Sequence, residues 1–249
     1  MSEAAFTELQ RVFSSLLSAG STSSSLADTL ADRAFDLFEA NIDAQMAHLP
    51  ALACAKGCPS CCALRVTATA PEIFLLARYV RSIDEYASAT ALGSLARRVK
   101  LANRATQGLS EAERMQLRQP CPFEVRGGCI IHPVRPLACR GHASFDRRAC
   151  AQAMAGRDVD VPVSAPHVAL RAVVQDSLRA ALAAARLASD LYELNQGLAL
   201  ALGHPERERA WQDGQDSLAP ARIAPAASTD ASLGRRPDGD AAAIPDGER

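Results

Sequence analysis

The chain has 249 residues, of which 48% are hydrophobic, and a formal net charge of −1 at pH 7. This balance excludes a bulk electrostatic attraction, so we expect neither nucleic acid nor a membrane surface as a partner. Aromatic residues make up only 4%, which favours Ala- and Leu-packed helices over an aromatic-rich β-sandwich. No apolar run reaches 18 residues, so a membrane-spanning helix is not expected. The start, MSEAAFTELQRVF, lacks the basic and apolar blocks of a secretory signal.

Apolar residues at helical spacing indicate the elements in chain order. Ser25 is placed to cap the second helix. Thr69 and Glu72 form a capping box for a helix after the first cysteines, and Ser110 and Glu113 form another box further on. The predicted helices cover about residues 6–17, 26–49, 70–80, 90–106, 111–119 and 166–194, with a short one at 206–211.

These elements predict one all-α domain over residues 1–212, with two irregular cysteine-rich loops that form a metal site inside a motif core at 54–150. No alternation of strands and helices is indicated, and no glycine-rich phosphate loop occurs. From Asp213 the composition shifts to Ala, Pro, Gly, Asp and Ser without periodic apolar residues. Residues 213–249 are therefore predicted to form a disordered tail.

The stretch CAKGCPSCC places four of the eight cysteines within nine positions. Gly57 and Pro59 force turns, so a short loop can wrap several sulfurs around one centre. Thiolate is a soft ligand suited to zinc, Cu(I) and iron–sulfur clusters. Because no secretion signal is evident, we expect a cytoplasmic protein with reduced thiols that bind metal rather than a disulfide framework. The predicted ligands in this stretch are Cys54, Cys58, Cys61 and Cys62.

Cys61 and Cys62 are adjacent, and neighbouring side chains diverge in extended backbone. We therefore predict that the two are not equivalent ligands of one ion. One of them, with a preference for Cys61, is expected to join Cys54 and Cys58. The other is expected to point toward a second centre, a multinuclear cluster or the core.

The second cysteine stretch lies between residues 121 and 150. Gly127 and Gly128 allow a tight reversal, and Pro133 and Pro136 stiffen the backbone that follows. Regular structure is not expected there, so a metal is the predicted means of holding the segment in place. Its predicted ligands are Cys121, Cys129, Cys139 and Cys150.

Two arginines lie close to Cys139 in the sequence. Several thiolates around a metal leave net negative charge, which Arg135 and Arg140 would offset while donating hydrogen bonds to sulfur or to backbone carbonyls. The alternative is that both are surface arginines or partners of Asp146. His132 and His142 are further candidate ligands, although eight cysteines suffice without them.

CAKGCPSCC, the CP pair at 121–122 and the segment CIIHPVRPLACR together resemble the YkgJ-like proteins, a family of cysteine-cluster proteins described as zinc- or iron-chelating. The resemblance covers about residues 54–150 and includes Arg135-Pro136 and Cys139-Arg140. It implies a metal-binding function for the cysteine set. Some flagellin lysine methylases contain a related cysteine module, and this likeness implies an iron–sulfur cluster. No reaction is implied, because the motif matches a metal site and not a substrate pocket.

Three functions fit these observations. The favoured one is a [4Fe–4S] cluster in electron transfer or maturation, because the first stretch offers a three-thiolate loop and Cys121 can supply a fourth ligand. The alternative is a zinc-binding structural module with two four-cysteine sites and an unknown protein partner. The third is an iron–sulfur oxidoreductase. Cys54-x3-Cys58-x2-Cys61 has the spacing of radical SAM enzymes, but their β/α barrel is not indicated, so a non-enzymatic role is preferred.

Overall fold

The computed structural model of the chain describes residues 3–19, 25–55, 57–87 and 94–223. Helices make up most of these residues, and the strands within them form two short antiparallel pairs. The prediction of an all-α fold is therefore confirmed. None of the helices in these ranges is both long and apolar enough to cross a membrane.

Strand β1 (Thr67–Ala68) pairs with β4 (Tyr192–Glu193), and β2 (Glu124–Val125) pairs with β3 (Gly128–Cys129). Three short 3-10 helices are η1 (Ser60–Ala63), η2 (His132–Val134) and η3 (Ala219–Ala221). The α-helices are α1 (Glu3–Ala19), α2 (Leu26–Met46), α3 (Ala70–Ala87), α4 (Leu95–Thr106), α5 (Glu111–Leu117), α6 (Leu137–Arg140), α7 (Arg147–Met154), α8 (Ala165–Ala184), α9 (Leu194–Gly203) and α10 (Arg207–Gln212).

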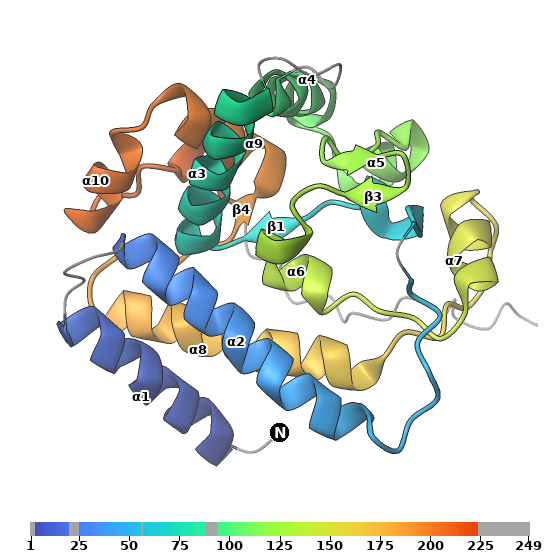
Figure 1. The fold of residues 1–249 in the computed structure, drawn as a ribbon, viewed down its shortest axis with the longest axis horizontal. Helices are drawn as coiled ribbons and strands as arrows, with labels where there is room; N and C mark the ends of the chain where they lie inside the picture. The colour runs from blue at the N-terminus through green and yellow to red at the C-terminus, as the bar shows by residue number, and fades with distance from the viewer. Residues whose placement is uncertain (1–2, 20–24, 56, 88–93, 224–249) are drawn as a thin grey trace, which may run out of the picture.

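Helices α1, α2 and α8 lie together along one side of the molecule (Figure 1). α1 packs along α8, and α2 packs on both α8 and α3. Their contact faces are buried side chains, including Phe13 of α1, Leu30 and Phe38 of α2, and Leu178 of α8. Burial of each such side chain contributes about 1.5–3 kcal/mol. Helix α6, which carries Cys139, packs on this layer through α2 and α8.

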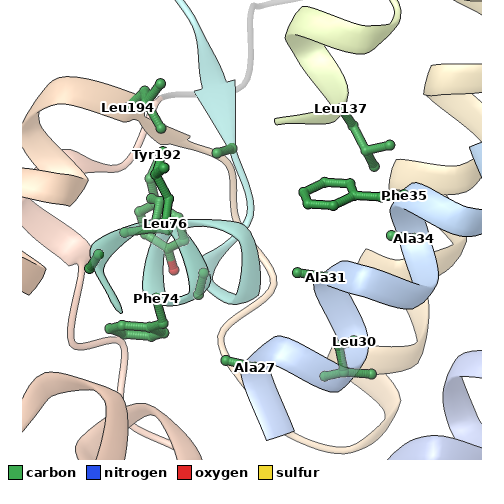
Figure 2. Packing of buried hydrophobic residues seen from close by; sticks show 14 of the residues in the cluster. Ala27, Leu30, Ala31, Ala34, Phe35, Phe74, Leu76, Leu137, Tyr192 and Leu194 are labelled. Carbon is green, nitrogen blue, oxygen red and sulfur yellow. The ribbon is translucent and has the colours of Figure 1, made fainter. Parts of the chain in front are cut away.

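Helix α3 joins this layer to a second group of helices, because its other side packs against α9, which in turn contacts α4. Gly197 permits the close approach of α9, since a Cβ there would lie 2.5 Å from Ile73 Cδ1. Between the two groups, Figure 2 shows Phe35 of α2 facing Leu137 of α6. The short helix in the second cysteine stretch is thus anchored on the core.

The helix predicted over residues 166–194 is two elements. α8 ends at Ala184, Arg186 takes a left-handed backbone conformation with φ of 60°, and the chain returns as β4 before α9 begins. The Ala- and Leu-rich pattern runs through both helices. Helical spacing of apolar residues therefore did not reveal the break, which is set by the pairing of β4 with β1.

Residues 213–223 are packed, which corrects the predicted start of the tail at Asp213. Leu218 is fully buried, the Tyr192 hydroxyl donates to Asp216 Oδ1 at 2.8 Å, and the Ile223 N–H donates to the Leu191 carbonyl at 2.9 Å. A few apolar residues without periodicity suffice here because they dock on a surface that the helices already provide. Residues 224–249, the rest of the predicted tail, lie outside the described residues.

Candidate metal centre

The two cysteine stretches meet at Ser144. Its carbonyl accepts a hydrogen bond from the Ala53 N–H at 3.0 Å, and its own N–H donates to Cys54 Sγ at 3.3 Å. Ser144 is itself fixed, since it forms an isolated antiparallel bridge with Val163. The backbone before α7 therefore sets the position of the first thiol, in the way that backbone N–H groups set and tune metal-bound sulfurs.

Two further contacts dock the first stretch onto the second. Gly57 and Gly127 both have positive φ, 91° and 78°, and a Cβ on Gly127 would lie 3.5 Å from the Cα of Gly57. Glycine adopts this backbone region without the penalty that other residues have. In addition, η1, which carries Cys61 and Cys62, packs against α7, which carries Cys150.

Cys129 lies in the β2–β3 hairpin, opposite Glu124. The turn residues Arg126 and Gly127 both have positive φ, as a two-residue type I′ turn requires. The predicted reversal before Cys129 is therefore confirmed, with its centre one residue earlier than the two glycines suggested. The Glu124 N–H donates to the Cys121 carbonyl at 3.2 Å, so Cys121 lies at the base of the same hairpin.

A buried carboxylate positions α6, the four-residue helix that carries Cys139. One oxygen of Glu72 accepts from the Thr69 N–H at 2.7 Å, which is one of the two contacts of the predicted capping box, and from the Thr69 hydroxyl at 2.8 Å. The other oxygen accepts from the Leu137 N–H at 2.7 Å. Burial raises the pKa of Glu72, while these hydrogen bonds lower it. The same side chain therefore fixes the starts of both α3 and α6.

Sequence reasoning found Glu72 as a cap of α3 but missed its role at α6. A signal was present, because α6 follows Pro136, which has no side chain able to cap a helix. The exposed N–H groups at such a helix start need an acceptor from elsewhere in the chain. The contacts at Ser144 were also missed, and no pattern in the sequence indicated them.

The hydrogen bonds of Arg140 hold the loop before α6 in place and do not involve the thiols. Its Nε donates to the Arg135 carbonyl at 2.8 Å and its Nη2 to the Pro133 carbonyl at 2.6 Å, while its Nη1 pairs with Glu39 of α2. The guanidinium also lies 4.2 Å from the centre of the Phe35 ring. None of these partners is a sulfur. The predicted hydrogen bonds to backbone carbonyls are therefore present, and the predicted contact with sulfur is not among the contacts of Arg140.

Arg135 occupies the position expected of the charge-compensating residue. Burial raises the pKa values of Cys129 and Cys139, and the positive charge of Arg135 opposes this rise. The pKa of Cys61 is lowered chiefly by its hydrogen bond with Cys62, and the charge of Arg135 adds to that lowering. Its Nε is buried and has no hydrogen-bond partner among the described residues. Neither arginine pairs with Asp146, which caps α7 through the N–H groups of Arg148 and Ala149. An unpartnered guanidinium N–H beside three thiols suits a negatively charged group held by those thiols.

The charges that shift the pKa values of the thiols relate the eight cysteines as two sets that share one member. Burial raises the pKa of Cys54, and nearby thiols of the first set add to the rise. Burial raises the pKa of Cys121 to about 11 and also raises that of Cys139, whose neighbours are other thiols of the second set. The first set is Cys54, Cys58, Cys61 and Cys150, and the second is Cys61, Cys62, Cys121, Cys129 and Cys139. All eight are free cysteines.

Cys61 and Cys62 do not diverge as predicted. The prediction assumed extended backbone, but the pair lies in η1, where the Cys62 N–H donates to the Pro59 carbonyl at 2.9 Å. The Cys62 thiol hydrogen-bonds to Cys61, which lowers the pKa of Cys61 to about 7 and raises that of Cys62. The two are nonetheless unequal, since Cys61 ionises first and neighbours both sets.

The two candidate histidines lie at the edges of this region. His132 is exposed in η2. His142 is partly buried, and burial lowers its pKa, as does the nearby charge of Arg171. The cysteines remain the principal candidate ligands.

Within the ranges that the structure describes, no three His, Cys, Asp or Glu side chains are placed to hold one metal ion together. The fold thus gathers the thiols into one region without giving them closed ligand geometry. The donor set still fits a thiophilic metal or an iron–sulfur cluster, because it is rich in soft sulfur and has a buried N–H of Arg135 available for an anion.

Comparisons of the chain with protein-family models, with curated proteins and with solved structures found no match. The candidate centre is therefore defined by its residues alone: eight thiols on four segments, a guanidinium beside three of them, and a buried carboxylate that positions the helix of Cys139.

Proposed function

We propose that the chain is a cysteine-cluster metal-binding protein that carries an iron–sulfur cluster of the [4Fe–4S] type and acts in electron transfer or maturation. The observation that carries the proposal is the buried Nε of Arg135, which has no hydrogen-bond partner among the described residues, together with the effect of its charge on the pKa values of Cys61, Cys129 and Cys139. A cluster held by thiolates is an anion, and this guanidinium would offset its charge. The proposal includes the likeness to the YkgJ-like proteins and a cytoplasmic location, where thiols stay reduced.

The convergence of the two stretches supports a shared ligand set. Cys61 lies in the first stretch, and its charge raises the pKa values of Cys129 and Cys139 of the second. Cys62 and Cys121 are also neighbours. When bound, a [4Fe–4S] cluster supplies one-electron redox chemistry, with a potential tuned by hydrogen bonds to sulfur and by exposure. The Ser144 N–H on Cys54 Sγ is one such hydrogen bond.

A zinc module is the second candidate, and the division of the thiols into two sets favours it. Two zinc ions with four thiolates each would use all eight cysteines in the closed arrangement of structural sites. In that case the ions would hold irregular loops in place for a protein partner. Cys61, which neighbours both sets, would belong to the first set, with Cys62 completing the second.

The deciding experiment is anaerobic purification from iron-replete cells, followed by metal and acid-labile sulfide analysis. We expect brown protein with about four iron and four sulfide per chain, and a broad visible band that dithionite bleaches. Colourless protein with about two zinc ions and no sulfide would replace the first proposal with the zinc module. Protein that binds neither metal, before or after reconstitution, would reject both.

A further inference from the structure

Helix α4 presents a basic face that is separate from the thiols. Its sequence, LARRVKLANRAT, contains four basic residues and no acidic one, although the whole chain has a net charge of −1. Arg97, Lys100 and Arg104 recur at the spacing that places them on one side of a helix, and all three are exposed. Leu101, which is 52% exposed, lies among them. We call these four residues the α4 face.

The α4 face has no partner within the part of the chain that is described. The opposite side of α4 is buried through Leu95, Val99 and Ala102, and the helix packs on α3 and α9. No ion pair between described residues includes a basic residue of the α4 face. Beside the face, an open pocket of about 520 Å³ lies between α4 and α9, with Lys100, His204 and Pro220 in its lining.

The chain itself contains a segment of complementary chemistry. Residues 238–248, DGDAAAIPDGE, carry four carboxylates and no basic residue, with Ile244 between the acidic ends. This pattern matches a face on which Leu101 lies between basic residues. The described chain leads toward the same region, because Pro220 lines the pocket and the Gln196 amide donates to its carbonyl at 2.8 Å, three residues before Ile223.

The chain after Ile223 is long enough for residues 238–248 to reach the α4 face. Fourteen residues lie between Ile223 and Asp238, and the fifteen Cα–Cα steps allow a span of up to about 50 Å, whereas α4 is about 18 Å long. Single exposed ion pairs are weak and screened by salt. Tethering compensates, because a linker of this length keeps the segment at a millimolar effective concentration.

We propose that the acidic segment 238–248 of this chain docks on the α4 face. The docking would cover a surface next to the cysteine region, since Arg98 of α4 donates from Nη2 to the Glu124 carbonyl at 2.8 Å, in the hairpin that carries Cys129. The inference does not depend on which metal the thiols hold.

The chain is well suited to a test by crosslinking because it has only two lysines, Lys56 and Lys100. A water-soluble carbodiimide activates carboxylates and joins them to amines in direct contact, so that an amide bond forms and the carbodiimide leaves as its urea. Treatment of the full-length protein at low salt should link Lys100 to a carboxylate of residues 238–248, as identified by mass spectrometry. At 0.5 M salt the yield should fall at least fivefold.

Matched variants separate docking from chance contact. Arg97→Glu with Arg104→Glu should reduce the Lys100 link at least fivefold, whereas Arg147→Glu with Arg148→Glu, two exposed arginines on α7, should leave it unchanged. Arg97→Gln with Arg104→Gln serves as a milder pair if the reversal unfolds α4, with circular dichroism as the check.

A second readout uses the acetylation rate of the two lysines in the full chain. Neutralising the segment by Asp238→Asn, Asp240→Asn, Asp246→Asn and Glu248→Gln should speed acetylation of Lys100 at least threefold and leave that of Lys56 unchanged. Three results would overturn the proposal: no link between Lys100 and the segment, an equal link in the Arg97/Arg104 variants, or a link found only between separate molecules.

Discussion

The two arginines near Cys139 differ in function although they lie five positions apart. Arg135 leaves its Nε unpartnered beside three thiols, whereas Arg140 uses its guanidinium on two carbonyls, Glu39 and the face of Phe35. Guanidinium groups are suited to both tasks, because they remain charged and offer several donors in a fixed plane. Sequence alone treats the two as equivalent, since both lie within four positions of Cys139.

We therefore predict separable effects of removing each arginine. Arg135→Met should speed removal of bound metal by a chelator about tenfold, the loss of roughly one charge-assisted hydrogen bond, with a small change in unfolding free energy. Arg140→Met should lower the free energy of unfolding by about 2–3 kcal/mol, because buried carbonyls lose their donor. Chelator challenge and urea unfolding measure the two quantities. Equal effects of the two substitutions on the rate of metal removal and on the free energy of unfolding would contradict this division of roles.

Glu72 predicts a characteristic dependence of stability on pH. Burial raises the pKa of Glu72 in the folded chain, so the folded state keeps a proton that the unfolded state releases. Wild-type stability relative to Glu72→Gln should therefore fall as pH rises above about 4.5, by at most about 1.4 kcal/mol per pH unit, until the folded pKa is passed. Urea unfolding of both proteins between pH 4 and 8 measures this difference.

Glu113 provides the matched control. It occupies the same position in the second capping box, where hydrogen bonds from Ser110 lower the pKa of its exposed carboxyl. Because the pKa of Glu113 is lowered in the folded chain, stability should change with pH in the opposite direction from that at Glu72. Wild type should gain stability relative to Glu113→Gln as pH rises toward about 4.5 and then stay level. If the stability difference between wild type and the Gln variant changed with pH in the same direction at both sites, burial would not be the main influence on the pKa of Glu72.

At the scale of elements, α6 shows how the fold holds a cysteine in an irregular stretch. A helix of four residues has no stability of its own in water. Glu72 fixes its first N–H, Leu137 packs beside Phe35, and Arg140 pairs with α2. At its end, Gly141 lies against α8, where a Cβ would come 2.5 Å from the Cβ of Arg171.

Gly141→Ala should therefore separate α6 from α8. The backbone of Gly141 is in the right-handed helical region, which alanine also adopts. The variant therefore tests whether there is room for a Cβ and introduces no backbone strain. Overpacking of this kind costs about 1–3 kcal/mol, and a shift of α6 should also lower metal content through Cys139. Gly203→Ala is the control, because no atom lies within 4 Å of its added Cβ. Equal unfolding midpoints for the two variants would show that α6 does not depend on this contact.

At the scale of the molecule, local patterns predicted the longer helices, while contacts between distant residues decided the remainder. The prediction that the second cysteine stretch has no regular structure is wrong, because η2, α6 and α7 lie in it. The capping boxes at Thr69 and Ser110 depend on residues three positions apart, so spacing sufficed to find them. The break between α8 and α9 depends on pairing of β4 with β1, more than 120 residues earlier. The contacts of Ser144 with Cys54 and of Glu72 with Leu137 are equally non-local. None of these contacts between distant residues produces a periodic pattern in the sequence.

The end of the packed chain gives the last prediction. A chain ending at Ile223 should keep the metal content of the full chain and unfold within about 1 kcal/mol of it, because exposed ion pairs of a docked acidic segment are weak. A chain ending at Gln212 should lose about 3–5 kcal/mol of unfolding free energy. The shorter chain removes fully buried Leu218, worth about 1.5–3 kcal/mol. It also removes the Tyr192–Asp216 and Leu191–Ile223 hydrogen bonds, each worth about 1 kcal/mol. Similar unfolding curves for the two truncated chains would mean that residues 213–223 are not part of the cooperative fold.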